Sequence, residues 1–460
     1  MNLLPRALAL GPQRAAPARA FRRFLPARGV SWAGSAVTLV ALPILLFART
    51  GSATASGVLV ALEALPYLVL GLPAGALADR WDRRRTLTVT SVGSAVLVGS
   101  IPIADAADVL TTAHLMVVAC LSACAFVFFD AAAFGALPAL VGSGGVAAAT
   151  GSLMTVSTLV ALIGPPVAGV LVATVGAPEA IGLDAASYTA AALLLARLPL
   201  AGVGGEVCGE VAAPVGRAVS GPVGGTVSAP VDGTVPGSGG RVPARTVSVS
   251  ESRRIRAEIA EGLAFIRTHP LVRPLTLLGI GIGNSLGSGA VLGLVVVVAV
   301  RRLGLDTHGG ALGLVFAAAA LGSLAAGLLL SRLQARIPVG RITLGALAAN
   351  WLLLLAWAQS THVGPALFAL AGRQFTNSLV SLNGIVVRQQ VTPDRLQARV
   401  NTTARMIAWG GQPVGAALAG VLADSAGTRV ALLVVGSGVL VSLAAGLASP
   451  ALRAGGRRCP

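Results

Sequence analysis

Acidic and basic side chains that interrupt long apolar segments are the residues of this chain best placed to do chemistry. Glu63 is the clearest case, because it lies inside the apolar run 55–78, about 24 Å along a helix from Asp79 at the end of that run. A carboxylate at such a depth in a hydrocarbon layer is costly unless it is paired, hydrated or protonated. Glu63 is therefore a candidate to carry protons. The alternative is a neutral, hydrogen-bonded glutamic acid that faces another helix.

A second polar stretch interrupts the apolar run 363–387. Arg373, Asn377 and Ser381 recur there at four-residue spacing, which places them on one face of a helix. They could hydrogen-bond a substrate or hold a counter-charge for the buried glutamate, and we interpret them as a candidate substrate cavity. Packing in a polar seam between helices is the alternative. Asp184, which we expect near the start of another helix, is interpreted as a cap or an interface residue.

The composition explains where these residues must lie. Hydrophobic residues make up 55% and charged residues 11% of the chain, and the mean hydropathy is +0.83, which excludes an ordinary soluble domain. A helix of about 20 apolar residues crosses a hydrocarbon core of roughly 30 Å. We therefore expect an all-α membrane protein with twelve transmembrane helices, at 31–48, 55–78, 86–104, 113–137, 149–174, 179–197, 274–299, 309–331, 340–358, 363–387, 400–422 and 428–448.

The 34 basic residues are all arginine, and their distribution predicts the topology. With both termini in the cytoplasm, only Arg49, Arg301, Arg302 and Arg429 fall on the outer side, as the positive-inside rule requires. We therefore interpret the net charge of +17 as a topology signal in a cell membrane, and not as a nucleic-acid-binding surface. The exclusive use of arginine is typical of a bacterium with a GC-rich genome.

The chain repeats itself in two halves. Gly164–Leu171 matches Gly415–Leu422, and Gly176 matches Gly427 at the same offset. This repeat predicts two six-helix bundles separated by a segment rich in Gly, Val, Pro and Ser. The expected parts are a basic cytoplasmic tail (1–28), the first bundle (29–199), a disordered cytoplasmic linker (200–250), an amphipathic interfacial helix (251–270), the second bundle (271–450) and a cytoplasmic tail (451–460).

A charged turn led by glycine connects the second and third apolar runs. Its pattern, Gly-x-x-x-Asp-Arg-x-x-Arg-Arg, resembles the signature loop between helices 2 and 3 of the major facilitator superfamily. This resemblance implies two six-helix halves that expose a central site to each side in turn. It also implies a conformational clamp, with an acidic residue of helix 4 as the partner of the arginines; a simple positive-inside anchor is the alternative. The clamp residues would be Gly75, Asp79, Arg80, Arg83, Arg84 and Asp130.

Further stretches, among them VTLVALPILLFARTGS in the first apolar run, carry a narrower resemblance. The segments LPYLVLGLPAGALADR, GPPVAG and QQVTPDRLQARVNTTARMIAWGGQPVGAALAG are similar to those of twelve-helix exporters related to macrolide efflux and enterobactin export proteins, in the drug:proton antiporter branch. The resemblance implies a monomer in the lipid bilayer that exports a lipophilic drug or natural product in exchange for protons. Gly164, Pro165 and Gly169 resemble the helix 5 motif of antiporters, where small residues and proline permit close packing and a bend.

Two other functions stay open at this point. One is a transporter of the same fold for a specific hydrophilic metabolite, and the other is a non-transporting membrane sensor. An enzyme is not expected, because the four cysteines and four histidines form no cluster of metal ligands or of nucleophile and base, and we expect no metal and no cofactor. Without lysine the chain also cannot form a Gly-x-x-x-x-Gly-Lys phosphate loop.

Overall fold

The computed structural model describes residues 12–78, 81–142, 145–198, 260–279, 282–306 and 311–453. Within these ranges the chain is helical and contains no strand, and ten helices are long and apolar enough to cross a membrane. The expected all-α membrane fold is therefore confirmed. The count of twelve spans and the side on which the termini lie stay predictions.

The six helices of the first half follow one another with short connections. They are α1 (Pro12–Thr50), α2 (Ala53–Ala78), α3 (Arg83–Ala106), α4 (Thr112–Val141), α5 (Val146–Val175) and α6 (Ala177–Ala196). Asp82 caps α3 by accepting a hydrogen bond from the Arg85 N–H at 2.6 Å. Gly142 and Gly176 end α4 and α5 with φ of 72° and 97°, a backbone conformation that favours glycine.

The second half begins after the part of the chain predicted as a linker, which lies outside the described residues. It contains the π-helical segment η2 (Pro274–Gly279), α8 (Ile282–Arg301), α9 (Ala311–Arg336), α10 (Val339–Gln359), α11 (Val363–Val391), α12 (Asp394–Ala426), α13 (Thr428–Gly436), α14 (Gly438–Ala448) and α15 (Pro450–Arg453). The helix at 260–268, from the region predicted to be amphipathic, buries Ile266 against Leu396 and Val400 of α12.

Two differences from the expected spans have clear physical reasons. First, α1 begins at Pro12, within the segment predicted as a tail, because Phe24 and Ala27 pack into a cluster with Phe129 and Leu140 of α4. Second, α11 is not among the ten apolar helices, although it is long enough to cross a membrane. Polar and charged residues such as Arg373, Gln374 and Asn377 lower its hydropathy, which is typical of a helix that faces other helices more than lipid. Part of α12 lies outside the residues whose side chains the structure describes.

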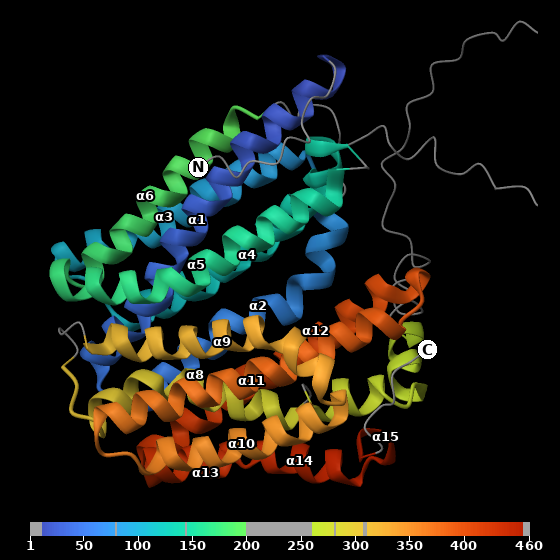
Figure 1. Cartoon of the computed structure of the whole chain (residues 1–460). Helices are drawn as coiled ribbons and strands as arrows, with labels where there is room; N and C mark the ends of the chain where they lie inside the picture. Colours follow the sequence, from blue (N-terminus) through green and yellow to red (C-terminus); the bar gives the residue numbers. More distant parts are fainter. Residues whose placement is uncertain are drawn as a thin grey trace, which may run out of the picture.

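The two halves lie against each other mainly through two helix pairs, α2 with α12 and α5 with α9 (Figure 1). Both pairs approach very closely. A Cβ added to Gly57 would lie 2.2 Å from the carbonyl oxygen of Ala416, and one added to Gly169 would lie 2.1 Å from the Cα of Gly313. Both contacts are near the end of the bundle that holds Thr50, Arg301 and Asp424. We call this the Asp424 end, and the opposite end, which holds Arg83 and Arg336, the Arg83 end.

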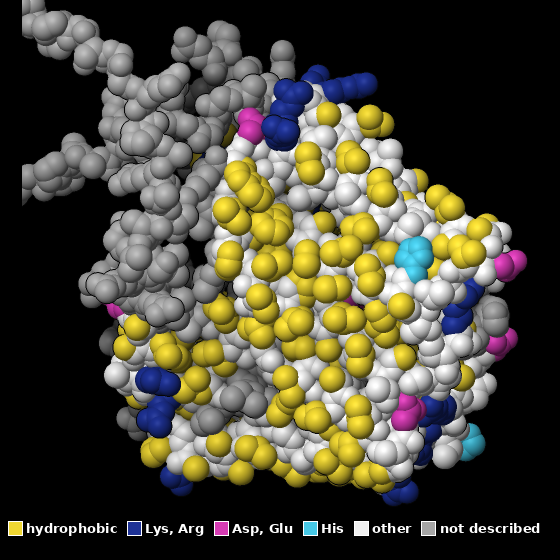
Figure 2. All heavy atoms as spheres, turned by 180° about the vertical axis from the view of Figure 1, so that it is seen from behind, with side chains coloured by type: hydrophobic (Ala, Val, Ile, Leu, Met, Phe, Trp, Pro, Cys, Tyr) yellow, Lys and Arg dark blue, Asp and Glu magenta, His cyan; other side chains and the backbone are white. Residues whose placement is uncertain are grey.

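The outer surface fits a lipid environment. Figure 2 shows one face of the molecule with apolar side chains over its middle and arginines toward its margins. Large apolar side chains are exposed on helices of both halves, such as Val96 and Ile103 of α3 and Phe368 of α11. A soluble protein rarely exposes so many, whereas a membrane-spanning bundle presents them to the acyl chains.

The close contact at Gly57 provides a test of the packing between the halves. We expect Gly57→Ala to lower the melting temperature of the purified protein by about 2–6 °C, because an added methyl group forces α2 and α12 apart. Gly71→Ala is the matched control in the same helix, since a Cβ there meets nothing within 4 Å. Fluorescence-monitored thermal unfolding measures both. Equal melting temperatures for the two variants would contradict the close contact.

Candidate functional site

A cavity of about 250 Å³ lies inside the first half, between α1, α2, α3, α4 and α6. Glu63 and Tyr67 of α2 line it, together with Asp184 and Tyr188 of α6. Most of the remaining lining side chains are apolar. Glu63, the candidate proton carrier from the sequence analysis, therefore faces a cavity.

Asp184 is the most constrained polar group at this cavity. It is 1% exposed, and its carboxylate accepts hydrogen bonds from the hydroxyl groups of Thr38 in α1 and Ser187 in α6. Gly34 permits this arrangement, because a Cβ there would lie 2.0 Å from the Ser187 oxygen. Of the two interpretations of Asp184, the helix cap is wrong, since α6 begins at Ala177 and the residue lies well inside the helix. The hydrogen bond from Thr38 of α1 agrees with the other interpretation, an interface residue. The sequence contains no signal that pairs α6 with α1.

The side chains around the cavity leave its negative charge without a basic partner. Among the described residues that line it, none is arginine, lysine or histidine. Glu63 makes no hydrogen bond or ion pair within the described part of the chain. The hydrogen bonds of Asp184 come from neutral hydroxyl groups. This arrangement can bind protons or a cation, because an uncompensated carboxylate is costly at this depth.

Arg373, a residue of the predicted substrate cavity, lies in α11 of the second half, as its position in the chain predicts. It is 1% exposed, and its guanidinium donates to the Gly287 carbonyl oxygen of α8 at 3.2 Å, while its Nε has no partner among the described residues. It does not line the cavity of Glu63, and within the described part of the chain it makes no ion pair with a carboxylate. The expected counter-charge between Arg373 and Glu63 is therefore not formed in this conformation.

Asn377, one turn further along α11, also faces α8. Its side-chain oxygen accepts hydrogen bonds from Asn284 at 3.1 Å and from Ser288 at 3.0 Å. Ser381, the third residue of the predicted face, is half-buried. The contacts of Asn377 correspond to the polar seam that was the alternative interpretation, and a role of this face in substrate binding stays a prediction.

Only part of the predicted clamp lies within the residues that the structure describes. Asp79 and Arg80 lie outside the described residues, and Gly75 is the last glycine of α2. Arg83 is half-buried at the start of α3, with its Nε 3.4 Å from the position that a Cβ of Gly135 in α4 would take. Arg84 is exposed. Arg83 thus lies against α4, the helix that carries Asp130.

Asp130 has a partner that the sequence did not reveal. The guanidinium of Arg28 in α1 donates to its carboxylate at 2.9 Å and lies 4.6 Å from the ring centroid of Trp32 and 4.5 Å from that of Phe129. Arg28 is 5% exposed. The sequence places Arg28 in the basic tail, because the apolar run begins after it. Asp130 as the acidic partner of the signature turn stays a prediction, beside this ion pair.

The predicted helix 5 motif lies at two close helix contacts. A Cβ on Gly164 would be 2.5 Å from the Cβ of Ala36 in α1, while Gly169 meets Gly313 of α9 in the other half. Pro165 lies inside α5 between them and is buried. The motif thus permits α5 to contact both its own half and the opposite one.

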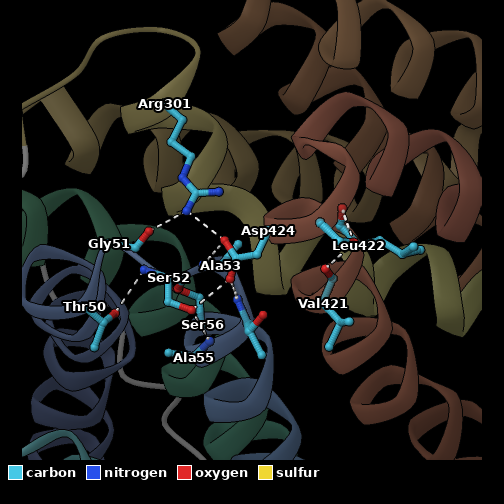
Figure 3. Close-up of polar contacts among 12 residues, drawn as sticks. Thr50, Gly51, Ser52, Ala53, Ala55, Ser56, Arg301, Val421, Leu422 and Asp424 are labelled. Carbon is cyan, nitrogen blue, oxygen red and sulfur yellow. Dashed lines mark hydrogen bonds and ion pairs between the residues drawn. The ribbon is translucent and has the colours of Figure 1, made fainter.

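Asp424 lies among polar contacts with Arg301 and the start of α2, as Figure 3 shows. Near the end of α12, its carboxylate accepts hydrogen bonds from the backbone N–H groups of Ala53 at 3.1 Å and Thr54 at 2.8 Å, and from the Ser52 hydroxyl at 2.9 Å. The guanidinium of Arg301 at the end of α8 donates to the same carboxylate at 2.8 Å. We call this set of contacts the Asp424 latch. It connects the second half to the start of α2 in the first half.

The electrostatics of the latch follow from its position. The first N–H groups of α2 have no partner within the helix, and the Asp424 carboxylate accepts hydrogen bonds from two of them. Its negative charge also interacts favourably with the positive N-terminal end of the helix dipole. Burial acts to raise the pKa of Asp424, but hydrogen bonds from Thr54, Arg301 and Ala53 outweigh it and hold this pKa well below its usual range. Because the pKa of Asp424 is lower in the folded protein, its ionised carboxylate stabilises the folded state. This stabilisation is lost only when the pH falls through the lowered pKa. Protonation at physiological pH therefore does not release the latch.

Comparisons with known proteins agree with this architecture. The profile of the Major Facilitator Superfamily matches residues 24–408. The chain is 26% identical over 436 residues to the multidrug efflux pump Tap of Mycolicibacterium fortuitum, covering 92% of this chain and 93% of the relative. It is 29% identical over 177 residues to the multidrug efflux pump Tap of Mycobacterium tuberculosis, covering 37% of this chain and 42% of the relative.

Solved structures share the fold at low sequence identity. A bacterial homolog of the human lysosomal transporter Spinster, in an inward-facing and unoccupied conformation, has a TM-score of 0.67 and 13% identity, covering 98% of this chain and 100% of that chain. A mutant of the nucleoside transporter NupG has a TM-score of 0.67 and 12% identity, covering 94% and 100%. At these identities the likeness shows the fold alone.

If the latch holds the Asp424 end closed, its loss should make residues at this end more accessible to solvent. In a variant without native cysteines, Ser56→Cys places a thiol at a position that is 3% exposed in α2. We expect Asp424→Asn to increase its labelling by a membrane-impermeant maleimide about threefold to tenfold, because the closed end loses its charged hydrogen bonds.

Asp105→Asn is the matched control. It breaks the ion pair of Arg49 with Asp105, which lies at the same end but within the first half. Labelling should then stay at the level of the parent. An equal increase in both variants would show that any lost charge loosens this end and that the latch has no special role.

Proposed function

The chain belongs to the major facilitator superfamily, and we propose that it is a proton-coupled exporter of a lipophilic small molecule. The observation that carries this proposal is the position of Glu63, whose carboxylate faces a mostly apolar cavity and makes no hydrogen bond to a described residue. A group that takes up a proton in one conformation and releases it in another couples transport to a proton gradient.

The conformation supports an orientation for this cycle. We place the Asp424 end outside and the Arg83 end in the cytoplasm, as the arginine distribution requires. The latch and the close contacts of Gly57 and Gly169 then close the outer end. A molecule in this state would load from the cytoplasm. Opening of the outer end would require the latch to break and α2 to separate from α12.

Two facts favour a lipophilic substrate over a hydrophilic metabolite. The relative that matches this chain over nearly its whole length is a multidrug efflux pump. In addition, most side chains that line the cavity of Glu63 are apolar, whereas a hydrophilic solute needs convergent hydrogen-bonding groups. We propose that the protein acts as a monomer in the cell membrane, since one chain contains both halves.

The transport proposal is tested by drug accumulation in an efflux-deficient host. We expect cells that express the protein to accumulate less of one or more lipophilic compounds, and a protonophore to restore accumulation. Glu63→Gln should raise accumulation to the level of cells without the protein, because an amide cannot carry the proton. Glu179→Gln, at the first turn of α6, is the control and should export normally.

Two outcomes would contradict this proposal. Export that is insensitive to the protonophore would exclude proton coupling. Proton-driven export by Glu63→Gln, with membrane expression confirmed, would exclude Glu63 as the carrier.

We further propose that the signature turn acts as the clamp that holds the Arg83 end closed in the outward-facing state. The position of Arg83 beside Gly135 of α4, on the same helix as Asp130, supports this role. We expect Asp79→Asn to lower turnover about tenfold and to change substrate affinity less than about twofold, because the clamp acts on the conformational step. Transport rates in proteoliposomes and equilibrium binding measure the two quantities. Equal losses in both would favour a role in substrate binding.

A further inference from the structure

Arg373 of α11 is a fully buried basic residue in the interior of the second half. We propose that the space beside Arg373, between α8, α10 and α11, binds one small inorganic anion of the size of chloride. Arg373 and Asn350 of α10 would donate hydrogen bonds to it. This inference goes beyond the transport proposal, because it assigns a second ligand to the half that does not contain Glu63.

The amino-acid sequence excludes an acidic partner from most helices around Arg373. The segments of η2, α8, α9, α10, α11, α13 and α14 contain neither aspartate nor glutamate. This count covers every residue of these helices. The remaining helix of this half, α12, contains Asp394 as its first residue and Asp424 in the latch. Glu63 of the first half faces a cavity that Arg373 does not line.

Both acids of α12 lie far from Arg373 along the helices. The Arg373 guanidinium donates to the Gly287 carbonyl oxygen of α8, and Arg301 in the latch is about 21 Å further along α8. Gly415 of α12 packs on the same turn of α8, whereas Asp394 lies about 31 Å away along α12. A buried guanidinium is costly without a compensating charge, so the sequence and the fold together favour a bound anion.

Unpaired donors mark where this anion would lie. The Nε of Arg373 and the side-chain nitrogen of Asn350 are buried and have no hydrogen-bond partner among the described residues. A buried donor without an acceptor is costly, and such groups in native proteins often contact an ion or an ordered water. The side-chain oxygen of Asn350 is also unpaired in the described part of the chain, and a water molecule beside the anion would donate to it.

The helix contacts place Asn350 on the side of α10 that faces the Arg373 contact. Leu354, one turn after Asn350 on the same face of α10, packs on Gly436. The Gly436 carbonyl oxygen lies 3.5 Å from the position that a Cβ of Gly287 would take. Gly287 is the residue whose own carbonyl oxygen accepts from Arg373. The two unpaired donors therefore border the same region between α8, α10 and α11.

Asn350 and Arg373 also lie at a similar depth in the bundle. Leu353 of α10 lies 3.1 Å from the position that a Cβ of Gly372 in α11 would take, so the turns that carry the two donors are neighbours. Asn350 is 0% and Arg373 is 1% exposed. An acceptor between them is enclosed by protein, which favours a halide-sized ion over a larger organic anion.

Replacement of chloride by other anions tests the site. We measure thermal unfolding of the purified full-length protein in lipid nanodiscs with sodium chloride, bromide, acetate, sulfate or gluconate at constant ionic strength. Chloride and bromide should raise the melting temperature by about 3 °C or more above its value in gluconate or sulfate, because a ligand that binds only the folded state stabilises it. Acetate tests a carboxylate as the bound group. Broadening of the chloride NMR signal by the protein measures binding directly.

The variants assign the effect to residues. Arg373→Met should remove the chloride effect and unfold in gluconate at or above the temperature of the parent, because an apolar side chain needs no counter-ion. Asn350→Asp should also remove the chloride effect, because its carboxylate replaces the anion beside Arg373. Arg341→Met changes an exposed arginine of α10 and is the matched control, which should keep the chloride effect of the parent. Asn350→Asp keeps the test open if Arg373→Met fails to fold.

Three outcomes would overturn the inference. Equal melting temperatures of the parent in all salts, without broadening of the chloride signal, would show that water alone fills this space. A chloride effect that persists in both Arg373→Met and Asn350→Asp would place the anion elsewhere. A larger effect of acetate than of chloride would exclude a halide-sized site. None of these results changes the expected drug accumulation or its sensitivity to a protonophore, so the transport proposal stands or fails separately.

Discussion

Charged groups inside a membrane-spanning bundle must be compensated by the protein, by protons or by a ligand, because the surrounding hydrocarbon cannot solvate them. The described residues meet this demand in different ways. Arg28 is paired with Asp130 inside the bundle, and Arg301 is paired with Asp424 at its end. The cavity of the first half differs from these pairs, because its two carboxylates have no basic partner among the described lining residues. We expect the functional site at this cavity, because the charge of its carboxylates is not compensated by the described lining residues.

The internal repeat has a structural counterpart in the glycine contacts. Equivalent glycines of the two halves contact equivalent neighbours. In each half, the first glycine of the repeated motif packs on the first helix of its own half, and the second glycine packs on the second helix of the opposite half. The contacts are Gly164 with Ala36 of α1, Gly415 with Leu286 of α8, Gly169 with Gly313 of α9, and Gly420 with Ala53 of α2. Close packing between the halves is therefore encoded twice, as a pseudo-two-fold arrangement predicts.

The sequence predicts the parts of this structure that depend on local pattern. Apolar runs predict the helices, and the repeat predicts the halves, because span length and small-residue spacing are local properties. Glu63 could be found for the same reason, as a single acid in an apolar run. The pairing of Arg28 with Asp130, the hydrogen bond of Thr38 to Asp184 and the seam of Arg373 depend on which helix faces turn toward each other. The spacing of residues along the chain does not specify which helix faces meet.

The latch and the cavity also show why the two halves need not be equivalent. Asp424 lies one turn beyond Gly420, and the matching position one turn beyond Gly169 is Ala173, so the charged latch is present on the α2–α12 side without a copy at that position of α5. The α2 helix starts at the latch and carries Glu63 further along. A change in charge at Glu63 and a break of the latch therefore act on the same helix. Such a helix can transmit the neutralisation of the cavity to the closed end, because both sites bias its position between the halves.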